Sequence, residues 1–171
     1  GFVEVSGKID LVLSGKIDVS APAGELGDIL IDPFNLVITD GAPPPNTVNT
    51  SYQSSTATEG LTGNVTIAAD NNITIEDLSD DELLFSTGTN VSFIADADGD
   101  GSGNFSMNLG DTIRSEQGDI AIAGTNITAG ILDTSTAAQD PGGNGNITGG
   151  DVTISAAGNI IADSILTFGR R

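Results

Sequence analysis

Cysteine and histidine are both absent from the 171 residues of this chain. Their absence excludes disulfide frameworks, thiol nucleophiles, imidazole general bases, and zinc sites built from thiolate or imidazole ligands. Any chemistry at a site must therefore use carboxylates, hydroxyls and metal ions with oxygen ligands.

Basic residues are also scarce, with 5 Lys and Arg against 24 Asp and Glu and a formal net charge of -19. Such a charge repels nucleic acid phosphates and anionic lipid surfaces, so we expect no nucleic acid partner. No apolar run approaches the roughly 18 residues that a membrane-spanning helix needs, so we expect no membrane insertion.

Aromatic residues make up 4% of the chain and tryptophan is absent. The hydrophobic fraction of 37% is nevertheless sufficient for a core, and Ile and Val dominate it. This composition predicts a stacked aliphatic interior rather than a core anchored by aromatic rings.

Apolar residues alternate with polar ones in short bursts, as in Val65 and Ile67, and in Ile120 and Ile122. Alternation with period two is typical of β-strands, and the Gly, Asn, Asp and Ser clusters between the bursts are typical of tight corners. The acidic stretch at 76–85 is consistent with a corner between strands or with a single helical turn. The pattern as a whole predicts an all-β fold.

Internal repeats organise the chain. The pentapeptide Ser6–Asp10 recurs as Ser14–Asp18, and a larger unit of strand, corner and strand occurs three times at irregular intervals. The copies of the larger unit are Gly63–Ala68 with Asn72–Ile75, Gly118–Ala123 with Asn126–Ala129, and Gly150–Ser155 with Asn159–Ala162.

Such a unit cannot bury its apolar face alone, so copies must stack on one another, which is the principle of a β-solenoid. The irregular interval favours a parallel β-helix with loops of different length. We therefore expect residues 1–171 to form a single β-helix segment of a longer protein, with protruding loops at 41–60 and 139–145. The side chains expected to point inward are Val65, Ile67, Ile73, Ile75, Ile120, Ile122, Ile127, Val152, Ile154 and Ile160.

Asp96, Asp98 and Asp100 alternate with small residues and Gly99. Carboxylates at alternate positions around a glycine turn are what a Ca²⁺-binding loop needs to wrap an ion. Where an EF-hand loop would supply its bidentate glutamate, this chain has Met107. A Ca²⁺ site at these aspartates and a solvated acidic corner therefore both remain open.

Catalytic residues are not singled out by any spacing. A glycosidase requires two carboxylates flanking the scissile bond, but no pair stands out among the 24 acidic residues. A groove for acidic polysaccharide would need more basic side chains than this chain offers, and we expect Arg114 to pair locally with an acid or a carbonyl. We therefore predict no catalytic residue and no enzymatic activity.

Several segments resemble large filamentous haemagglutinin-like exoproteins, in particular the region that follows their N-terminal secretion domain. The similarity runs through Gly1–Lys8, Gly27–Ile38, Val91–Gly101 and Gly110–Ile113, with a pattern typical of cyanobacterial members. The resemblance implies a right-handed parallel β-helix and a secreted location at the bacterial cell surface. It also implies an outer-membrane two-partner-secretion transporter as a partner, acting through a domain missing here because the Asn-Pro-Asn motifs of that domain are absent.

The same resemblance implies adhesion or aggregation, with glycans or proteins on the surfaces of other cells as binding partners. The absence of cysteine fits export through an oxidising periplasm, and a small-residue composition explains it equally well. We therefore expect an adhesive stalk segment. The alternatives are a carbohydrate-active β-helix and a Ca²⁺-dependent matrix-binding module.

Overall fold

The computed structural model describes residues 1–7, 11–13, 15–21, 23–136 and 148–169. Strands account for 48% of the structure and helix for 3%, which confirms the all-β prediction. The elements are β1 Phe2–Gly7, β2 Asp28–Pro33, β3 Leu36–Thr39, β4 Ser51–Ser54, α1 Ser55–Glu59, β5 Asn64–Ala69, β6 Ile73–Ile75, β7 Glu82–Phe85, β8 Asn90–Ala95, β9 Phe105–Met107, β10 Thr112–Ser115, β11 Ile120–Gly124, β12 Ile127–Asp133, β13 Val152–Ala156 and β14 Ile160–Leu166.

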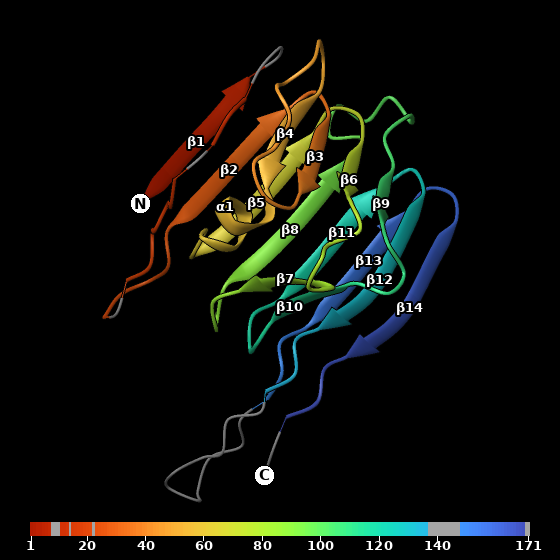
Figure 1. Cartoon of the computed structure of the whole chain (residues 1–171). Coiled ribbons are helices and arrows are strands. Elements are labelled where there is room, and N and C mark those ends of the chain that lie inside the picture. The colour runs from red at the N-terminus through yellow and green to blue at the C-terminus, as the bar shows by residue number, and fades with distance from the viewer. Residues whose placement is uncertain (8–10, 14, 22, 137–147, 170–171) are drawn as a thin grey trace, which may run out of the picture.

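Two sheets contain all of these strands (Figure 1). The first sheet has six strands in the order β1-β2-β5-β8-β11-β13. The second has eight strands. Seven of them follow the order β4-β3-β6-β9-β12-β10-β7, and the eighth, β14, pairs with β12 in addition. Every pair of named strands is parallel.

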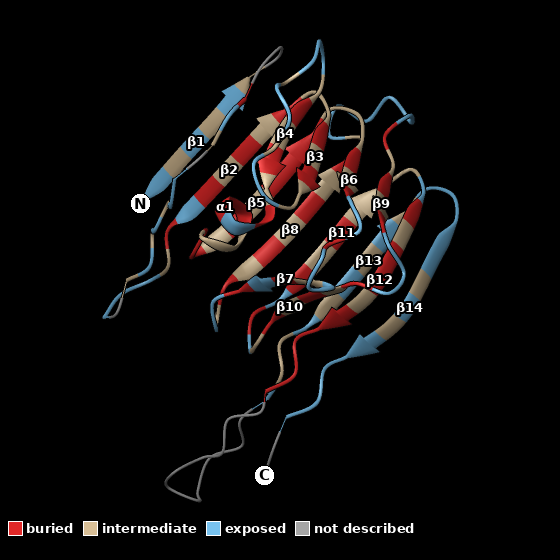
Figure 2. Cartoon of the chain, in the orientation of Figure 1, coloured by how far each residue is buried: buried red, intermediate tan, exposed pale blue. Residues whose placement is uncertain are grey.

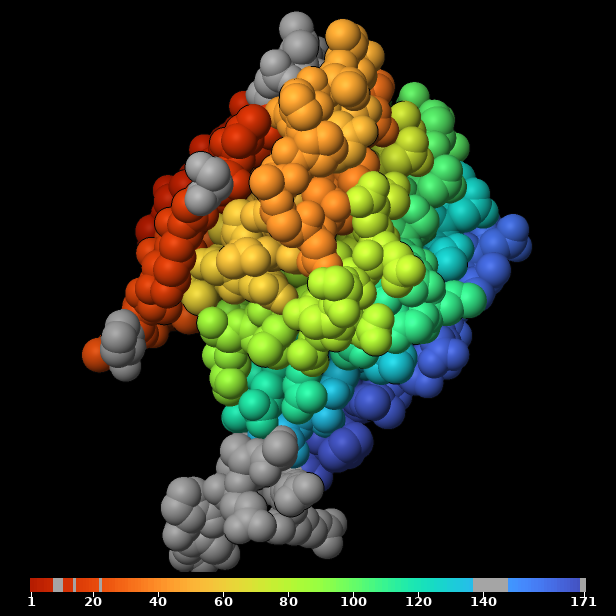
Figure 3. Space-filling model, viewed as in Figure 1, coloured from red at the N-terminus to blue at the C-terminus, as the bar shows by residue number. Residues whose placement is uncertain are grey.

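From β2 onward the chain alternates between the sheets. One strand of the first sheet with the strands of the second sheet that follow it is here called a layer, and β1 alone makes up the first layer. Successive layers lie side by side, so that β1 and β14 are at opposite ends of the molecule (Figures 1 and 3). The repeated unit of strand, corner and strand corresponds to β5 with β6, β11 with β12, and β13 with β14. The smaller repeat at 6–18 falls partly outside the described residues.

Equivalent residues of successive layers form buried columns between the sheets. In the first sheet, one column passes through Ile29, Val65, Val91 and Ile120. In the second sheet, another passes through Leu36, Ile73, Phe105 and Ile127. Each of these side chains is at most 1% exposed (Figure 2). Period-two alternation places one face of every strand inward, and parallel registry then aligns the inward residues.

Seven of the ten predicted inward side chains are confirmed as buried, from Val65 to Ile127. The exceptions all lie in the last layer, where Val152 and Ile154 are half-buried and Ile160 is 48% exposed. These residues occupy the expected columns. They are less buried because no further described layer covers them.

Aromatic rings contribute more to the interior than the composition predicted. Phe85, Phe93 and Phe105 are among the largest fully buried side chains. The ring centroids of Phe85 and Phe93 lie 6.4 Å apart, and those of Phe93 and Phe105 lie 5.5 Å apart. The prediction of an interior without anchoring rings was therefore wrong at this point of the stack, because Phe93 on the first sheet packs against Phe85 and Phe105 on the second, so that three of the chain's six phenylalanines form one cluster.

The expectation of a protruding loop over 41–60 needs correction. Residues 51–54 form β4, which pairs with β3. Residues 55–59 form α1, which begins where the Ser54 hydroxyl accepts a hydrogen bond from the Ala57 backbone N–H at 3.1 Å. Residues 41–50 and Gly60 are therefore the part of the expected loop that lies outside helices and strands. The second expected loop, at 139–145, lies outside the described residues.

The acidic stretch at 76–85 contains no helix. A turn at residues 79 and 80 leads into β7, and Asp81 has a positive φ of 58°. The interpretation as a corner between strands is confirmed. Among the described residues, no helix is long and apolar enough to cross a membrane.

Candidate functional site

The three predicted metal ligands lie together in the loop that joins β8 to β9. One carboxylate oxygen from each of Asp96, Asp98 and Asp100 lies within 4.8 Å of the others. Asp96 adopts a positive φ of 61°, and Gly99 and Gly101 adopt 72° and 86°. These left-handed residues reverse the chain within a few positions, so side chains at alternate positions converge.

Hydrogen bonds within the loop already engage the same carboxylates. Asp96 accepts from the backbone N–H of Gly101 at 2.9 Å and from the Thr125 hydroxyl at 3.2 Å. The bond from Gly101, followed by that from Thr125, lowers the pKa of Asp96. Asp100 accepts from the backbone N–H of Ser102 at 2.9 Å. The loop is therefore held together by the protein's own donors.

The donor set suits a hard cation, since Ca²⁺ binds about six to eight oxygen atoms from carboxylates, carbonyls and water. Asp98 and Asp100 are exposed, so water could complete the coordination of an ion held there. Met107 is 5% exposed and belongs to the hydrophobic core, so it supplies no ligand to an ion held at the loop. The residues fit a loosely held Ca²⁺ better than a closed site.

A second acidic group, which the sequence analysis did not identify, consists of Asp77, Asp81 and Asp111. Asp111 is fully buried, and it accepts hydrogen bonds from the Leu78 backbone N–H and the Asn108 side-chain amide, both at 3.0 Å. The registry of β7 with β10 brings Asp111 beside Asp81, 30 positions earlier in the chain. Through these bonds, Asp111 connects the corner before β7 with the corner before β10. Only the registry of β7 with β10 could have predicted this acidic group, and a local sequence pattern does not reveal which strands pair.

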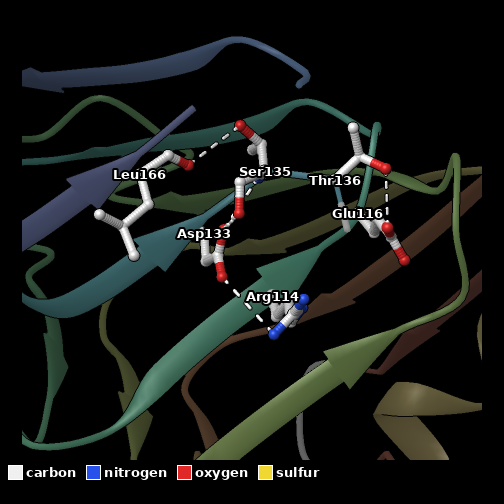
Figure 4. Close-up of polar contacts among 7 residues, drawn as sticks. Arg114, Glu116, Asp133, Ser135, Thr136 and Leu166 are labelled. Atoms are coloured by element: carbon white, nitrogen blue, oxygen red, sulfur yellow. Dashed lines mark hydrogen bonds and ion pairs between the residues drawn. The ribbon is translucent and has the colours of Figure 1, made fainter. Parts of the chain in front are cut away.

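Arg114 pairs with an acid, as the sequence analysis expected. Its guanidinium lies 3.7 Å from the carboxylate of Asp133, whose side chain is 10% exposed (Figure 4). Asp133 also accepts hydrogen bonds from the backbone N–H of Ser135 at 2.8 Å and from the Ser135 hydroxyl. The neighbouring Glu116 accepts from the Thr136 hydroxyl at 2.8 Å.

A surface hollow of about 300 Å³ lies beside this network, lined by Leu84, Phe85, Ser86, Thr87, Arg114 and Glu116. Its lining therefore includes one cation, Arg114, and one carboxylate, Glu116. Asp133 is committed to Arg114 and Ser135, and Glu116 to Thr136, so each acid already has a structural partner. The arrangement can donate hydrogen bonds from Arg114 to a ligand, and Glu116 is the one carboxylate among the described residues that line the hollow.

A carboxyl group with a raised pKa is the usual mark of a general acid. Burial raises the pKa of Glu59, which accepts a hydrogen bond from the Leu84 backbone N–H at 2.9 Å. Burial, together with Asp70 and Glu4, also raises the pKa of Asp32. Through the bond from Leu84, the Glu59 carboxylate joins α1 to β7.

Asparagines form a ladder at the corner that precedes the second sheet. The side-chain oxygen of each accepts a hydrogen bond from the backbone N–H of the next, at 3.0 to 3.1 Å. The members are Asn35, Asn72, Asn104, Asn126 and Asn159.

A mixed ladder runs along the start of the first-sheet strands. Asn64 donates to Asp28 at 3.0 Å, Asn90 donates to Asn64 at 2.9 Å, and the Asp119 backbone N–H donates to Asn90 at 3.0 Å. The Asp151 backbone N–H then donates to Asp119 at 2.8 Å. Repeated polar residues at both corners are therefore structural, since they supply the hydrogen-bond partners that turning backbone requires.

No protein-family model, curated protein or solved structure matches this chain. The resemblance to filamentous haemagglutinin-like exoproteins therefore stays a prediction.

Proposed function

We propose that this chain is a right-handed parallel β-helical segment in the stalk of an exported bacterial surface protein, and that it acts in adhesion or aggregation. The asparagine ladder carries the architectural part, because it joins equivalent corners from Asn35 to Asn159 through successive layers. Such continuity supports one repeating coil. Right-handedness is the hand of about 98% of crossovers between parallel strands in one sheet.

The way in which the layers are joined supports a role as a stalk. From the layer of β2 onward, each layer is joined to the next by two parallel sheets, two polar ladders and buried columns, so bending or stretching must disturb all of them together. The described acids around Arg114 are engaged in structural contacts, which favours a binding or supporting role over catalysis. In this proposal, export uses an outer-membrane transporter that recognises a domain missing here. The adhesive partners are glycans or proteins of other cells.

Adhesion can be tested with beads coated with the protein. We expect coated beads to attach to bacterial or host cells, or to one another, more than beads coated with the same chain after denaturation. A library of immobilised glycans, probed in parallel, distinguishes sugar from protein receptors. Equal attachment by the native and denatured coatings on every surface would contradict the proposal.

The carbohydrate-active alternative is tested by incubating the protein with acidic and neutral polysaccharides and measuring new reducing ends or unsaturated products. Our proposal expects none. Product formation that is lost in a Glu116→Gln variant would establish the enzymatic alternative instead.

A Ca²⁺-dependent binding module is a second candidate, favoured by the convergence of Asp96, Asp98 and Asp100. In this case bead attachment should require Ca²⁺ and should be lost in an Asp98→Asn, Asp100→Asn double variant. Attachment that is unchanged after removal of Ca²⁺ by a chelator would rule this candidate out.

A further inference from the structure

Arg114 is the only basic residue between Lys16 and Arg170 in the sequence. Its side chain is 33% exposed, and among the described residues its guanidinium has one polar partner, the Asp133 carboxylate at 3.7 Å (Figure 4). That distance exceeds the range of a hydrogen bond. A guanidinium carries five N–H donors, so this largely buried cation keeps donors that can bind a ligand.

Strand pairing places Arg114 in the lining of the hollow described above. On the outward face of the second sheet, β7, β10 and β12 align Leu84, Arg114 and Asp133 in one row. Leu84 is 46% exposed, and the chain beyond β7 adds the exposed hydroxyl groups of Ser86 and Thr87 to the same lining. The hollow therefore combines an apolar side chain, a hydrogen-bonding cation and hydroxyl groups, a mixture that is typical of small-molecule sites.

Arg114 is held in place before any ligand binds. Its strand lies between β7 and β12, and Asp133, which faces its guanidinium, is itself fixed by the Ser135 backbone N–H at 2.8 Å. A second surface hollow, of about 220 Å³, contains Lys16, whose side chain is 61% exposed. Ordering an exposed lysine on binding costs conformational entropy that the held arginine has already lost. The hollow at Arg114 is therefore the better candidate for a binding site.

The charges at the hollow favour a ligand without net charge. Arg114 is accompanied by Glu116 in the lining and by Asp133 at 3.7 Å. An anionic ligand would be repelled by these two carboxylates and by the net charge of -19 on the whole chain. A cationic ligand would be repelled at short range by Arg114. A neutral ligand avoids both costs.

Hydrogen-bonding capacity narrows the ligand further. Arg114 can only donate, whereas the hydroxyl groups of Ser86 and Thr87 can donate and accept. Sugar hydroxyl groups also do both, and two neighbouring hydroxyls on one ring present two oxygens to the planar guanidinium. The C–H groups of the ring can pack against Leu84. The volume of about 300 Å³ is at the lower end of the range for small-molecule sites, so the bound portion of the ligand is short.

We propose that this hollow binds the terminal neutral sugars of a glycan. The Arg114 guanidinium donates hydrogen bonds to adjacent ring hydroxyls, the Ser86 and Thr87 hydroxyls bind a further sugar oxygen, and Leu84 contacts the apolar face of the ring. Asp133 orients Arg114, and the negative charge of Glu116 disfavours acidic sugars. This proposal rests on the adhesive function proposed above, for which it names the binding site and the class of ligand.

Nuclear magnetic resonance of the isotope-labelled protein tests binding and locates it. The probes are the neutral disaccharides cellobiose, lactose and N,N′-diacetylchitobiose. With at least one of them, we expect saturable shifts of the Ser86 and Thr87 backbone amides and of the Arg114 side-chain N–H. The charged counterparts, anionic cellobiouronic acid and cationic chitobiose, should bind more weakly than cellobiose and N,N′-diacetylchitobiose. The proposal would be overturned if no neutral disaccharide gave saturable shifts at the hollow, or if a charged form bound more tightly than its neutral counterpart.

Variants test the roles of the individual side chains. Arg114→Lys keeps a positive charge beside Asp133 but lacks the planar fork, so it should fold and should bind the same disaccharide about tenfold more weakly. Thr87→Val removes one hydroxyl from an exposed turn and should also weaken binding. The matched control is Thr153→Val, at an exposed position of β13 outside the hollow, which should bind as the wild type does.

Melting temperatures establish that each variant is folded. Unchanged affinity in folded Arg114→Lys, or equal losses of affinity in Thr87→Val and Thr153→Val, would overturn the proposal. The site and the adhesive function can also fail separately. Bead attachment by a wild type that binds none of the disaccharides would overturn the site and leave adhesion in place. Saturable shifts at the hollow, combined with equal attachment of native and denatured coatings, would support the site and contradict adhesion.

Discussion

The side-chain oxygen of Asn72 accepts a 3.0 Å hydrogen bond from the backbone N–H of Asn104, 32 positions further along the chain. The Asn104 amide approaches the same oxygen at 3.4 Å. One side chain thus supplies an acceptor to the corner of the next layer. The same relationship recurs between Asn104 and Asn126, so asparagine at this position fixes how consecutive layers sit on one another.

Replacing Asn72 by alanine should lower the free energy of unfolding by about 1 to 2 kcal/mol, because a half-buried corner loses an acceptor for the Asn104 N–H. Urea denaturation measures the change. The matched control is Asn159→Ala, at the exposed end of the ladder, where we expect a smaller loss. Equal losses in the free energy of unfolding for the two variants would show that burial of the corner does not increase the contribution of the ladder to stability.

Ile122 is 1% exposed and lies in the column between Phe93 and Ile154. Ile122→Asp should destabilise the protein by several kcal/mol, on the order of 3 to 5, since it places a carboxylate without a partner in an apolar interior. Ala121→Asp, with the side chain on the outward face of the same strand, is the control. Thermal melting should separate the two variants clearly, and similar melting temperatures would contradict the inward orientation of Ile122.

Glycine is required at position 118 by close packing. A Cβ atom there would lie 2.0 Å from the Thr89 carbonyl oxygen, a distance that no packing adjustment of a side chain can relieve. Gly118→Ala should therefore destabilise the protein by roughly 2 kcal/mol or more. At Gly110, the nearest atom to such a Cβ is the Asn108 amide nitrogen at 3.7 Å, an ordinary contact. Gly110→Ala should melt within a few degrees of the wild type, and a comparable loss in both variants would argue against this packing.

Calcium should raise the melting temperature more than NaCl at equal ionic strength, because an ion bound only by the folded state stabilises it by mass action. The effect should disappear in the Asp98→Asn, Asp100→Asn double variant. Asparagine oxygens can still accept the hydrogen bonds from Asp100 and Ser102 that the carboxylates accept, so the loop should keep its shape. Identical wild-type melting curves in the two salts would leave a solvated acidic corner as the correct interpretation.

Asp40 gives stability a dependence on pH. Hydrogen bonds from Ser79 and then Ser55 lower the pKa of Asp40 in the folded state. The stabilisation is fully present above the ordinary pKa of an aspartate, and it is lost as the pH falls toward the lowered folded value. Comparing melting temperatures at pH 7 and pH 3, we expect a smaller acid-induced fall for Asp40→Asn than for the wild type. A larger fall in the variant would contradict the direction of the shift.

Strand positions, the parallel stacking of repeated units and the inward face of each strand were predictable from the amino-acid sequence. The reason is local: alternation at Val65 and Ile67 or at Ile120 and Ile122 determines which side chains share a face. Repetition of the unit then requires copies to align. The acidic loop at Asp96 was predictable for the same reason, since its three carboxylates lie within five consecutive residues.

Only the tertiary structure determined which side chains from different layers contact one another. The registry of β7 with β10 brings Asp81 beside Asp111, 30 positions further along the chain. Packing of the two sheets against each other brings Phe93 of the first sheet against Phe85 and Phe105 of the second. Arg114 could be assigned an acidic partner in general, but only the pairing of β10 with β12 selects Asp133. The burial of Ile127 and the exposure of Ile160 follow from position in the stack, because residues of one type and one register differ only in whether another layer covers them.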